Sequence, residues 1–344
     1  MARFRARPED FEVEELPLYA PAGAGPFLWL WIEKRGLDTA AMAADIARAL
    51  GLPRREVGWA GRKDRHAVTR QAITVPAHAE ARLPDLDSLG AGLRILEVQR
   101  TDERLRTGQL IGNRFRLRVV EVEADQADDA ARALARLEER GLANRFGAQR
   151  YGRDGRNAER GRALLSRARH SGDRRRAFLM ISALQSRVFD EVLARRPADE
   201  LWPGDLAVHH ATGDWRWIDR VEPHQGALER FEISPTGPIF GTKTKKPRGR
   251  AAELEAEVLA DFDLPPIDSL RLPQGLRLYG DRRALRVQPR RAGCRFDADE
   301  RALEVSFELP SGSYATVLLE ALFPQGLIEG PAAPAQSQAD ADGA

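Results

Sequence analysis

The sequence predicts an α+β protein of two domains, one formed by both ends of the chain and the other by its middle. Strand patterns lie near both ends, whereas long helical patterns and a dense run of arginine occupy the middle. A middle segment that differs from both flanks indicates an insertion. We expect one domain at 1–140 plus 287–330 and an inserted domain at 141–286. A tail at 331–344, rich in Ala, Pro, Gln and Asp, is expected to be disordered.

The N-terminal part alternates between strand and helix patterns. Asp38 or Thr39 can cap a helix over 40–50, which Gly51 and Pro53 end. A second helix fits 125–140 and ends at Gly141. Strands are expected where apolar residues alternate or run together, at 11–13, 27–32, 69–75, 94–98 and 115–119.

The middle contains one long helical pattern over 174–196, and its apolar stripe is expected to comprise Phe178, Ile181, Leu184, Val188 and Leu193. A shorter helix is expected at 253–259. The segment 242–250 has no periodicity and is expected to be an exposed basic loop. Strand patterns return near 285–287 and 303–309, and a last helix is expected over 316–322.

Composition indicates a globular protein, with 42% apolar and 31% charged residues among 344. No apolar run reaches the roughly 18 residues that cross a membrane. The N-terminus lacks the apolar stretch of a signal peptide, so a cytoplasmic location is expected. Nothing in the sequence suggests an obligate oligomer, and a monomer is expected.

Arginine is concentrated in one segment. Residues 140–176 hold twelve Arg against Asp154, Glu159 and Asp173, a local net charge of +9, although the whole chain carries only +2. Guanidinium forks match phosphate geometry, so this segment suggests a polyanionic partner. A solvated helical face would give the same pattern.

Asp64 lies in the most informative stretch, Gly58 to Gln71. Gly58 and Gly61 permit tight turns, and the flanking residues Arg62, Lys63, Arg65 and His66 are basic or titratable. A carboxylate among cations is favoured in its charged form and can act as a nucleophile or base, while the cations hold a phosphate backbone. An ordinary surface cluster of ion pairs would give the same local sequence.

Other catalytic systems find little support. The chain has no P-loop, no complete dinucleotide-binding glycine pattern, no His-Glu-x-x-His and no Gly-x-Ser-x-Gly. His209, His210 and His224 are poorly spaced for a metal site. The lone Cys294 is expected to be a buried structural residue. We therefore expect neither a metal nor a cofactor.

A second dense segment, 144–152, interleaves Phe146 and Tyr151 with Gly147, Gly152 and long polar side chains. Aromatic faces stack on unpaired bases, while Arg and Gln reach base edges or phosphates. A turn with two core aromatics is the alternative.

Together these segments resemble the TruD family of tRNA pseudouridine synthases. The resemblance spans nearly the whole chain in the family's order, and the most specific pair of blocks is Ala60-Gly-Arg-Lys-Asp64 with Phe146-Gly-Ala-Gln-Arg150. The other matching blocks are Pro8-Glu-Asp-Phe11, Gly112-Asn113, Ser182 to Phe189, Gly204-Asp205, Thr236 to Gly241 and Leu309 to Thr316.

The resemblance implies a mixed, largely antiparallel catalytic sheet with an inserted TRUD domain, and isomerisation of uridine 13 in the D-arm of tRNA without metal or cofactor. It places the catalytic aspartate on Asp64. It places substrate contacts on Phe11, Asn113 and Tyr314, with Tyr314 or Phe11 stacking on the flipped base. The RNA backbone is expected to contact Arg62, Lys63, Arg65 and Arg150.

Three positions depart from the family pattern: Tyr314 replaces the usual Phe, Gln185 the usual Arg, and Glu320 follows Leu where Arg is usual. These changes put local ion pairs in doubt. A non-catalytic RNA-binding protein or tRNA folding chaperone on the same scaffold is the alternative function, and a small-molecule enzyme is a third.

Overall fold

The chain divides into two compact units. The first comprises Met1–Leu134, Arg290–Gly312 and Leu322 onward, and the second comprises Ala135–Pro289 and Ser313–Ala321. The computed structural model describes residues 1–330 apart from 91, 167–171, 267, 268, 270, 271, 275 and 277, so the expected disordered tail lies outside the described residues. The unit limits differ by a few residues from the expected 140 and 287, and their assignment as catalytic and TRUD domains stays a prediction.

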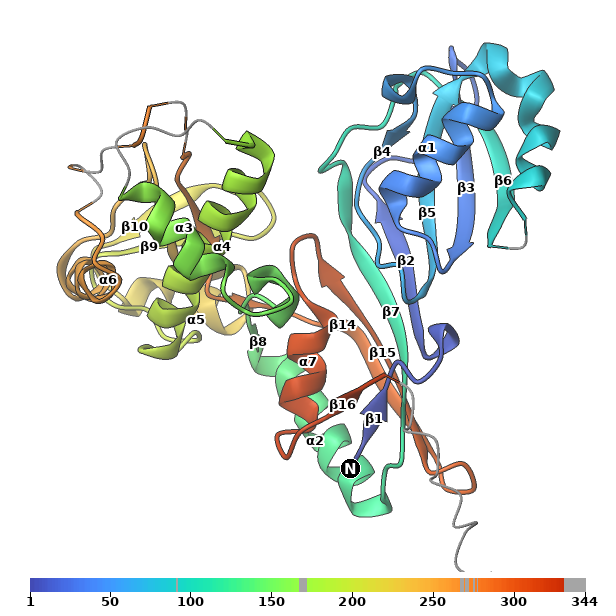
Figure 1. Cartoon of the computed structure of the whole chain (residues 1–344). Coiled ribbons are helices and arrows are strands. Elements are labelled where there is room, and N and C mark those ends of the chain that lie inside the picture. Colours follow the sequence, from blue (N-terminus) through green and yellow to red (C-terminus); the bar gives the residue numbers. More distant parts are fainter. Residues whose placement is uncertain are drawn as a thin grey trace, which may run out of the picture. The chain divides into compact units, whose positions relative to one another are not determined.

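A mixed sheet forms the first unit, in strand order β14-β15-β7-β2-β5-β3-β6, with β1, β4 and β16 paired along it (Figure 1). β2 is parallel to β5 and β1 to β16, whereas the other neighbours are antiparallel. The expected largely antiparallel sheet is confirmed. Its strands are β1 (Arg3–Phe4), β2 (Phe11–Pro17), β3 (Phe27–Arg35), β4 (Gly58–Trp59), β5 (Val68–Pro76), β6 (Leu93–Thr101), β7 (Leu110–Val120), β14 (Arg290–Asp297), β15 (Ala302–Pro310) and β16 (Ile328–Glu329).

Helix α1 (Thr39–Ala49) and the 3-10 segment η3 (Ala77–Leu89) pack on this sheet. Asp38 caps α1, because its Oδ1 accepts from the backbone N–H groups of Ala40 and Ala41 at 2.8 and 3.1 Å. The apolar core beneath α1 includes Leu30, Ile46 and Ile73. Short 3-10 turns η1 (Pro8–Asp10) and η2 (Arg54–Glu56) and helix α2 (Ala124–Arg140) complete this part of the chain.

The second unit combines helices with a small antiparallel sheet in the order β10-β9-β11-β12 and a separate pair, β13-β8. Its elements are β8 (Leu142–Ala143), η4 (Ala148–Tyr151), α3 (Asn157–Leu165), α4 (Arg174–Ala194), β9 (Asp205–His209), β10 (Trp215–Ile218), η5 (Glu222–His224), α5 (Gln225–Glu229), β11 (Ile233–Ile239), α6 (Gly249–Asp261), β12 (Asp281–Ala284), β13 (Arg286–Val287) and α7 (Ala315–Leu322).

The long helix α4 is the centre of the second unit, and its buried face contacts α3 and α6. Ile181, Leu184 and Val188 lie in that core as expected. Phe178, however, is 62% exposed, so its assignment to the apolar stripe was wrong. The buried face at the start of α4 runs through Ala177 and Ile181, and Phe178 is rotated about 100° from Ala177. None of the described helices is long and apolar enough to cross a membrane.

Candidate active site

The loop that carries Asp64 connects β4 to β5 and is packed against a buried ion pair. Lys63 Nζ contacts Glu15 Oε2 at 2.5 Å, and the two side chains are only 2% and 0% exposed. A Cβ on Gly61 would lie 2.9 Å from Lys63 Nζ and 3.2 Å from Glu15 Oε2, so a larger residue would press against the buried ion pair. Lys63 therefore anchors the loop from within, and the structure does not present it to an RNA backbone as the sequence suggested.

A second buried lysine holds the backbone of the same loop. Lys34 is fully buried, and its Nζ donates to the carbonyl oxygens of Leu37 at 2.6 Å, Asp64 at 2.8 Å and Lys63 at 3.4 Å. Burial lowers its pKa from 10.5 to about 8, and the nearby Asp64 and Asp38 carboxylates oppose this shift. Three donors on one ammonium thus meet three carbonyls and fix the chain around Asp64.

Neutral hydrogen bonds complete the support of the loop. The Lys63 backbone N–H donates to Thr39 Oγ1 at 2.9 Å, and that hydroxyl donates to Gln71 Oε1, also at 2.9 Å. Gln71 Nε2 donates in turn to the Gly61 carbonyl at 3.3 Å. Thr39 and Gln71 are both buried, so the loop is held at its start and middle by preorganised groups.

The Asp64 carboxylate faces the opposite way, towards solvent and Arg5. Its Oδ2 accepts from Arg5 Nη2 at 2.7 Å, and the Asp64 side chain is 43% exposed. Arg5 is itself largely buried, at 12%, and its other Nη donates to Glu329 Oε1 at 2.6 Å. A carboxylate that is fixed on one side by an arginine and open on the other can act on a substrate.

Arg5 also separates Phe11 from solvent. Its guanidinium carbon lies 3.8 Å from the centroid of the Phe11 ring, and Phe11 is only 2% exposed. Phe11 packs edge-on against Phe115, with ring centroids 6.3 Å apart. The ring therefore supports Arg5 in this structure, and its face is not open for a base to stack on.

Asn113 lies on β7 with Glu15 of β2 and Leu309 of β15 as its sheet partners. Its Oδ1 is buried and has no hydrogen-bond partner among the described residues. A buried polar atom without a partner is costly, so this acceptor is available to a water molecule or a ligand that supplies a donor.

Tyr314 belongs to the second unit, where it packs on the 144–152 segment. Its ring centroid lies 5.9 Å from that of Phe146, and a Cβ on Gly147 would lie 2.7 Å from Tyr314 Cδ1. Gly147 therefore allows the close approach of the Tyr314 ring. On the same segment, the Arg283 guanidinium lies 4.3 Å from the Phe146 ring centroid, and burial lowers the pKa of Arg283 to about 10.

The arginines expected to bind RNA lie in different environments. Arg62 and Arg65 are exposed, and Arg65 Nε donates to the Gly36 carbonyl at 3.0 Å. Arg150 instead donates from Nε to Ser186 Oγ at 3.0 Å and from Nη2 to Ser182 Oγ. Arg150 is thus tied to α4, whereas Arg62 and Arg65 lie on the surface beside Asp64.

The departures from the family pattern have structural partners. Gln185 is buried, and its Nε2 donates to the carbonyls of Phe240 at 2.6 Å and Tyr279 at 3.1 Å. Glu320 on α7 pairs with Arg145 at 2.9 Å, and both side chains are about half exposed. Neither replacement leaves an unpaired charge.

The one cysteine of the sequence lies on β14, outside the Asp64 loop. Cys294 on β14 is half-buried, where the sequence suggested a buried residue, and burial raises the pKa of its thiol. Within the described ranges, no three His, Cys, Asp or Glu side chains gather where they could hold a metal ion.

Sequence reasoning missed Arg5, Lys34 and Glu15 as parts of the Asp64 site. Arg5 lies 59 residues and Lys34 lies 30 residues before Asp64 in the sequence, and Glu15 lies 48 residues before Lys63. The local signal was weak: Arg5 lies three residues before the Pro8-Glu-Asp-Phe11 block, and Glu15 lies four residues after Phe11. A mixed sheet that presents an arginine-paired carboxylate defines a candidate centre for nucleophilic or acid–base catalysis.

Comparison with known proteins identifies the family. The family model described as tRNA pseudouridine synthase D (TruD) matches residues 1–172 and 168–322. The chain belongs to the TruD family, which confirms the resemblance seen in its motifs.

Relatives match over most of their length. A tRNA pseudouridine synthase D from Anaeromyxobacter sp. (strain Fw109-5) is 42% identical over 94% of this chain and 92% of its own. That from Thermus thermophilus is 38% identical over 92% of this chain and 86% of its own. A crystal structure of the putative tRNA pseudouridine synthase D from Methanosarcina mazei matches with a TM-score of 0.68 and 18% identity, covering 94% of this chain and 93% of that one, which shows the shared fold.

Proposed function

We propose that this protein is a tRNA pseudouridine synthase that isomerises uridine 13 in the D-arm, with Asp64 as its catalytic residue. Membership of the TruD family supports the reaction class. The observation that carries the proposal for Asp64 is its environment: a carboxylate 43% exposed, paired with Arg5 at 2.7 Å, on a loop fixed by buried lysines. We further propose that the enzyme acts in the cytoplasm as a monomer, without metal or cofactor.

The reaction is an isomerisation, so its atoms balance without a co-reactant. The N1–C1′ bond breaks, the uracil rotates, and a C5–C1′ bond forms. C5 loses its proton and N1 gains one. Asp64 either forms a transient covalent bond to the ribose or uracil, or removes a ribose proton. In both routes Arg5 holds one carboxylate oxygen and leaves the other for the substrate.

The remaining site residues have supporting roles in this proposal. Asn113 Oδ1, which lacks a partner among the described residues, accepts from the uracil edge. Phe11 supports the guanidinium of Arg5. Tyr314 contacts the RNA substrate, and Arg62, Arg65 and Arg150 contribute positive charge towards its phosphates. The structure favours Lys63 as a positioning residue, because its ammonium is paired with buried Glu15.

The decisive experiment is nucleoside mapping by mass spectrometry of unmodified tRNA after incubation with wild type, Asp64→Asn and Asp45→Asn. Asp45 is a matched control, since it is 34% exposed and pairs with Arg48 at 2.8 Å on α1. Pseudouridine is expected at a single D-arm site with wild type and Asp45→Asn. Asp64→Asn is expected to lose about 10²–10⁴-fold in rate while still binding tRNA.

Loss of tRNA binding in step with activity would contradict a catalytic role for Asp64. Tight binding without pseudouridine from any of the three proteins would favour the RNA-binding or chaperone function. A third variant, Arg5→Gln, is expected to lower the rate about 10–100-fold, because a charge-assisted hydrogen bond contributes about 1.5–3 kcal/mol.

A further inference from the structure

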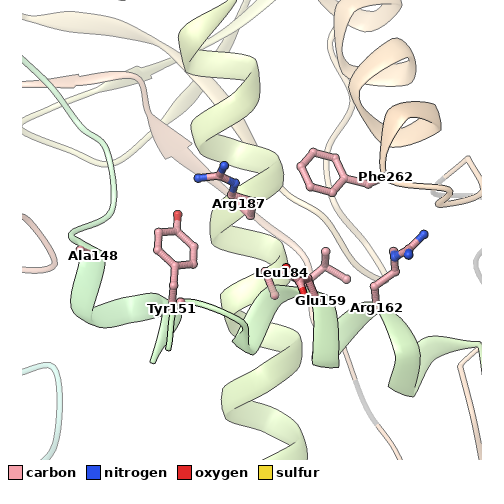
Figure 2. Close-up of a pocket in the computed structure, with 9 residues that line it drawn as sticks. Ala148, Tyr151, Glu159, Arg162, Leu184, Arg187 and Phe262 are labelled. Carbon is pink, nitrogen blue, oxygen red and sulfur yellow. The ribbon is translucent and has the colours of Figure 1, made fainter. Parts of the chain in front are cut away.

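A cavity of about 450 Å³ lies entirely within the second unit (Figure 2). Its walls are η4, α3 and α4, together with Phe262 just after α6. Sites that hold small organic ligands have volumes of about 300–1,000 Å³. The chemistry proposed for Asp64 gives this cavity no role, so its residues need a separate explanation.

Two aromatic rings line the cavity and are partly exposed. Figure 2 shows the rings of Tyr151 and Phe262 on either side of Arg187, with Leu184 nearby on α4. The Tyr151 hydroxyl donates to Asp190, whose other oxygen accepts from the Phe146 backbone N–H at 3.0 Å. The Tyr151 ring is therefore fixed in advance. Rigid aromatic faces suit a flat base, because every base can stack on them.

One cation of the cavity is open to a ligand. Arg187 is exposed on α4 between buried Ser186 and Val188, and its guanidinium carbon lies 5.8 Å from the Tyr151 ring centroid. It makes no hydrogen bond or ion pair with any other residue that the structure describes. Arg162, by contrast, pairs with Asp263, and Glu159 is occupied by Arg156 at 2.9 Å. The open positive charge is thus beside the aromatic rings.

We propose that this cavity binds one unpaired nucleotide of the RNA substrate, with its base against Tyr151 and Phe262 and its phosphate on Arg187. A neutral apolar ligand would bury Arg187 without a partner, and a simple anion would leave the rings unused. A nucleotide satisfies both features. The inference rests on the proposed function only in taking RNA as the substrate.

The test compares Arg187→Gln with Arg230→Gln, a matched loss of one exposed charge in the same unit, at an arginine that pairs with Glu232 and does not line the cavity. Affinity for unmodified tRNA is measured by fluorescence anisotropy over a KCl series. Arg187→Gln is expected to weaken binding about five- to tenfold and to lower the salt slope by about 1, as for loss of one phosphate contact. Arg230→Gln is expected to match wild type.

A second variant fills the cavity. Ala148 lines it and is exposed, so Ala148→Trp occupies the space without removing core contacts. The same loss of tRNA affinity is expected, with an unchanged melting temperature. Ultraviolet crosslinking of the wild-type complex, followed by peptide mass spectrometry, is expected to place RNA adducts on Tyr151 or Phe262, and these adducts should vanish in Ala148→Trp.

Wild-type affinity in both variants, or crosslinks only elsewhere, would overturn the inference. If uridine monophosphate binds in the cavity but no RNA adduct forms there, the cavity is a site for a free nucleotide, and the inference is overturned. Pseudouridine formation by wild type is measured in parallel. If no pseudouridine forms but both variants weaken tRNA binding, the proposed function fails and the cavity assignment stands.

Discussion

The Asp64 loop and the Tyr151 segment each hold one side chain at a fixed position, but the groups that fix it differ in charge. Around Asp64 the anchors are charges taken out of water, namely Lys34 and the Lys63–Glu15 pair, whose side chains are at most 2% exposed. Around Tyr151 the anchor is a hydrogen bond from a neutral phenol to Asp190, and burial raises the pKa of both groups.

The charged and the neutral anchors leave their carboxylates in different environments. The carboxylate that the charged anchors support, Asp64, stays open to solvent, whereas Asp190 is partly buried and its oxygens are used by Tyr151 and Phe146. A buried charge pair contributes little net stability but costs much if one partner is lost. The two regions should therefore respond very differently to removal of a single group.

The largest effect is expected from Glu15→Gln. This change leaves the Lys63 ammonium buried without a counter-charge, so the free energy of unfolding should fall by about 3–5 kcal/mol, as measured by urea denaturation. The double variant Glu15→Leu/Lys63→Met removes both charges and should recover most of that loss. A single variant as stable as wild type would show that the pair is not a charged anchor.

The next largest effect is expected from Lys34, in the pH dependence of the free energy of unfolding. Its pKa is about 8 in the folded protein against an ordinary 10.5, so the unfolded chain binds more protons between these values. Stability therefore rises with pH across that window, by up to about 3 kcal/mol, and Lys34→Met should lack this rise. Free energies of unfolding of wild type and Lys34→Met, measured at pH 7.5, 9 and 10, test this predicted rise. Asp64→Asn should move the rise to lower pH, because Asp64 is the first of the groups that oppose the shift.

A smaller effect is expected where the anchor is neutral. Tyr151→Phe removes one hydrogen bond to Asp190, and the free energy of unfolding should fall by about 1–2 kcal/mol in thermal melts at neutral pH. Phe146 still donates to the same carboxylate, which limits the loss. A loss as large as that of Glu15→Gln would erase the contrast between the two regions.

The smallest effect is expected at the exposed pair of Arg145 and Glu320. Both side chains are about half exposed, so Arg145→Ala should change the free energy of unfolding by less than about 0.5 kcal/mol. Matched melts at low and high salt would reveal any larger electrostatic contribution, which would mean that solvent screens this pair poorly.

Secondary structure with a clear period was predictable from sequence, and elements without one were not. The helices at 39–49, 124–140 and 174–194 follow from amphipathic patterns and caps. The small sheet β10-β9-β11-β12 was missed, because β11 contains two prolines and the other three strands are four or five residues long. The strand expected near 285–287 corresponds to β13, which pairs with β8 outside that sheet. Phe178 was misplaced because periodicity fixes a helical face only to within about one residue.

Local motifs and their order were enough to predict the family, an inserted middle segment and Asp64 as the candidate catalytic residue. The pairing of each cation with a carboxylate follows only from the folded chain. Arg5 rather than Lys63 contacts Asp64, Lys63 instead pairs with Glu15, and Phe11 lies beneath Arg5. Such partners are chosen by sheet register and burial between residues far apart in the chain, and no local pattern records that choice.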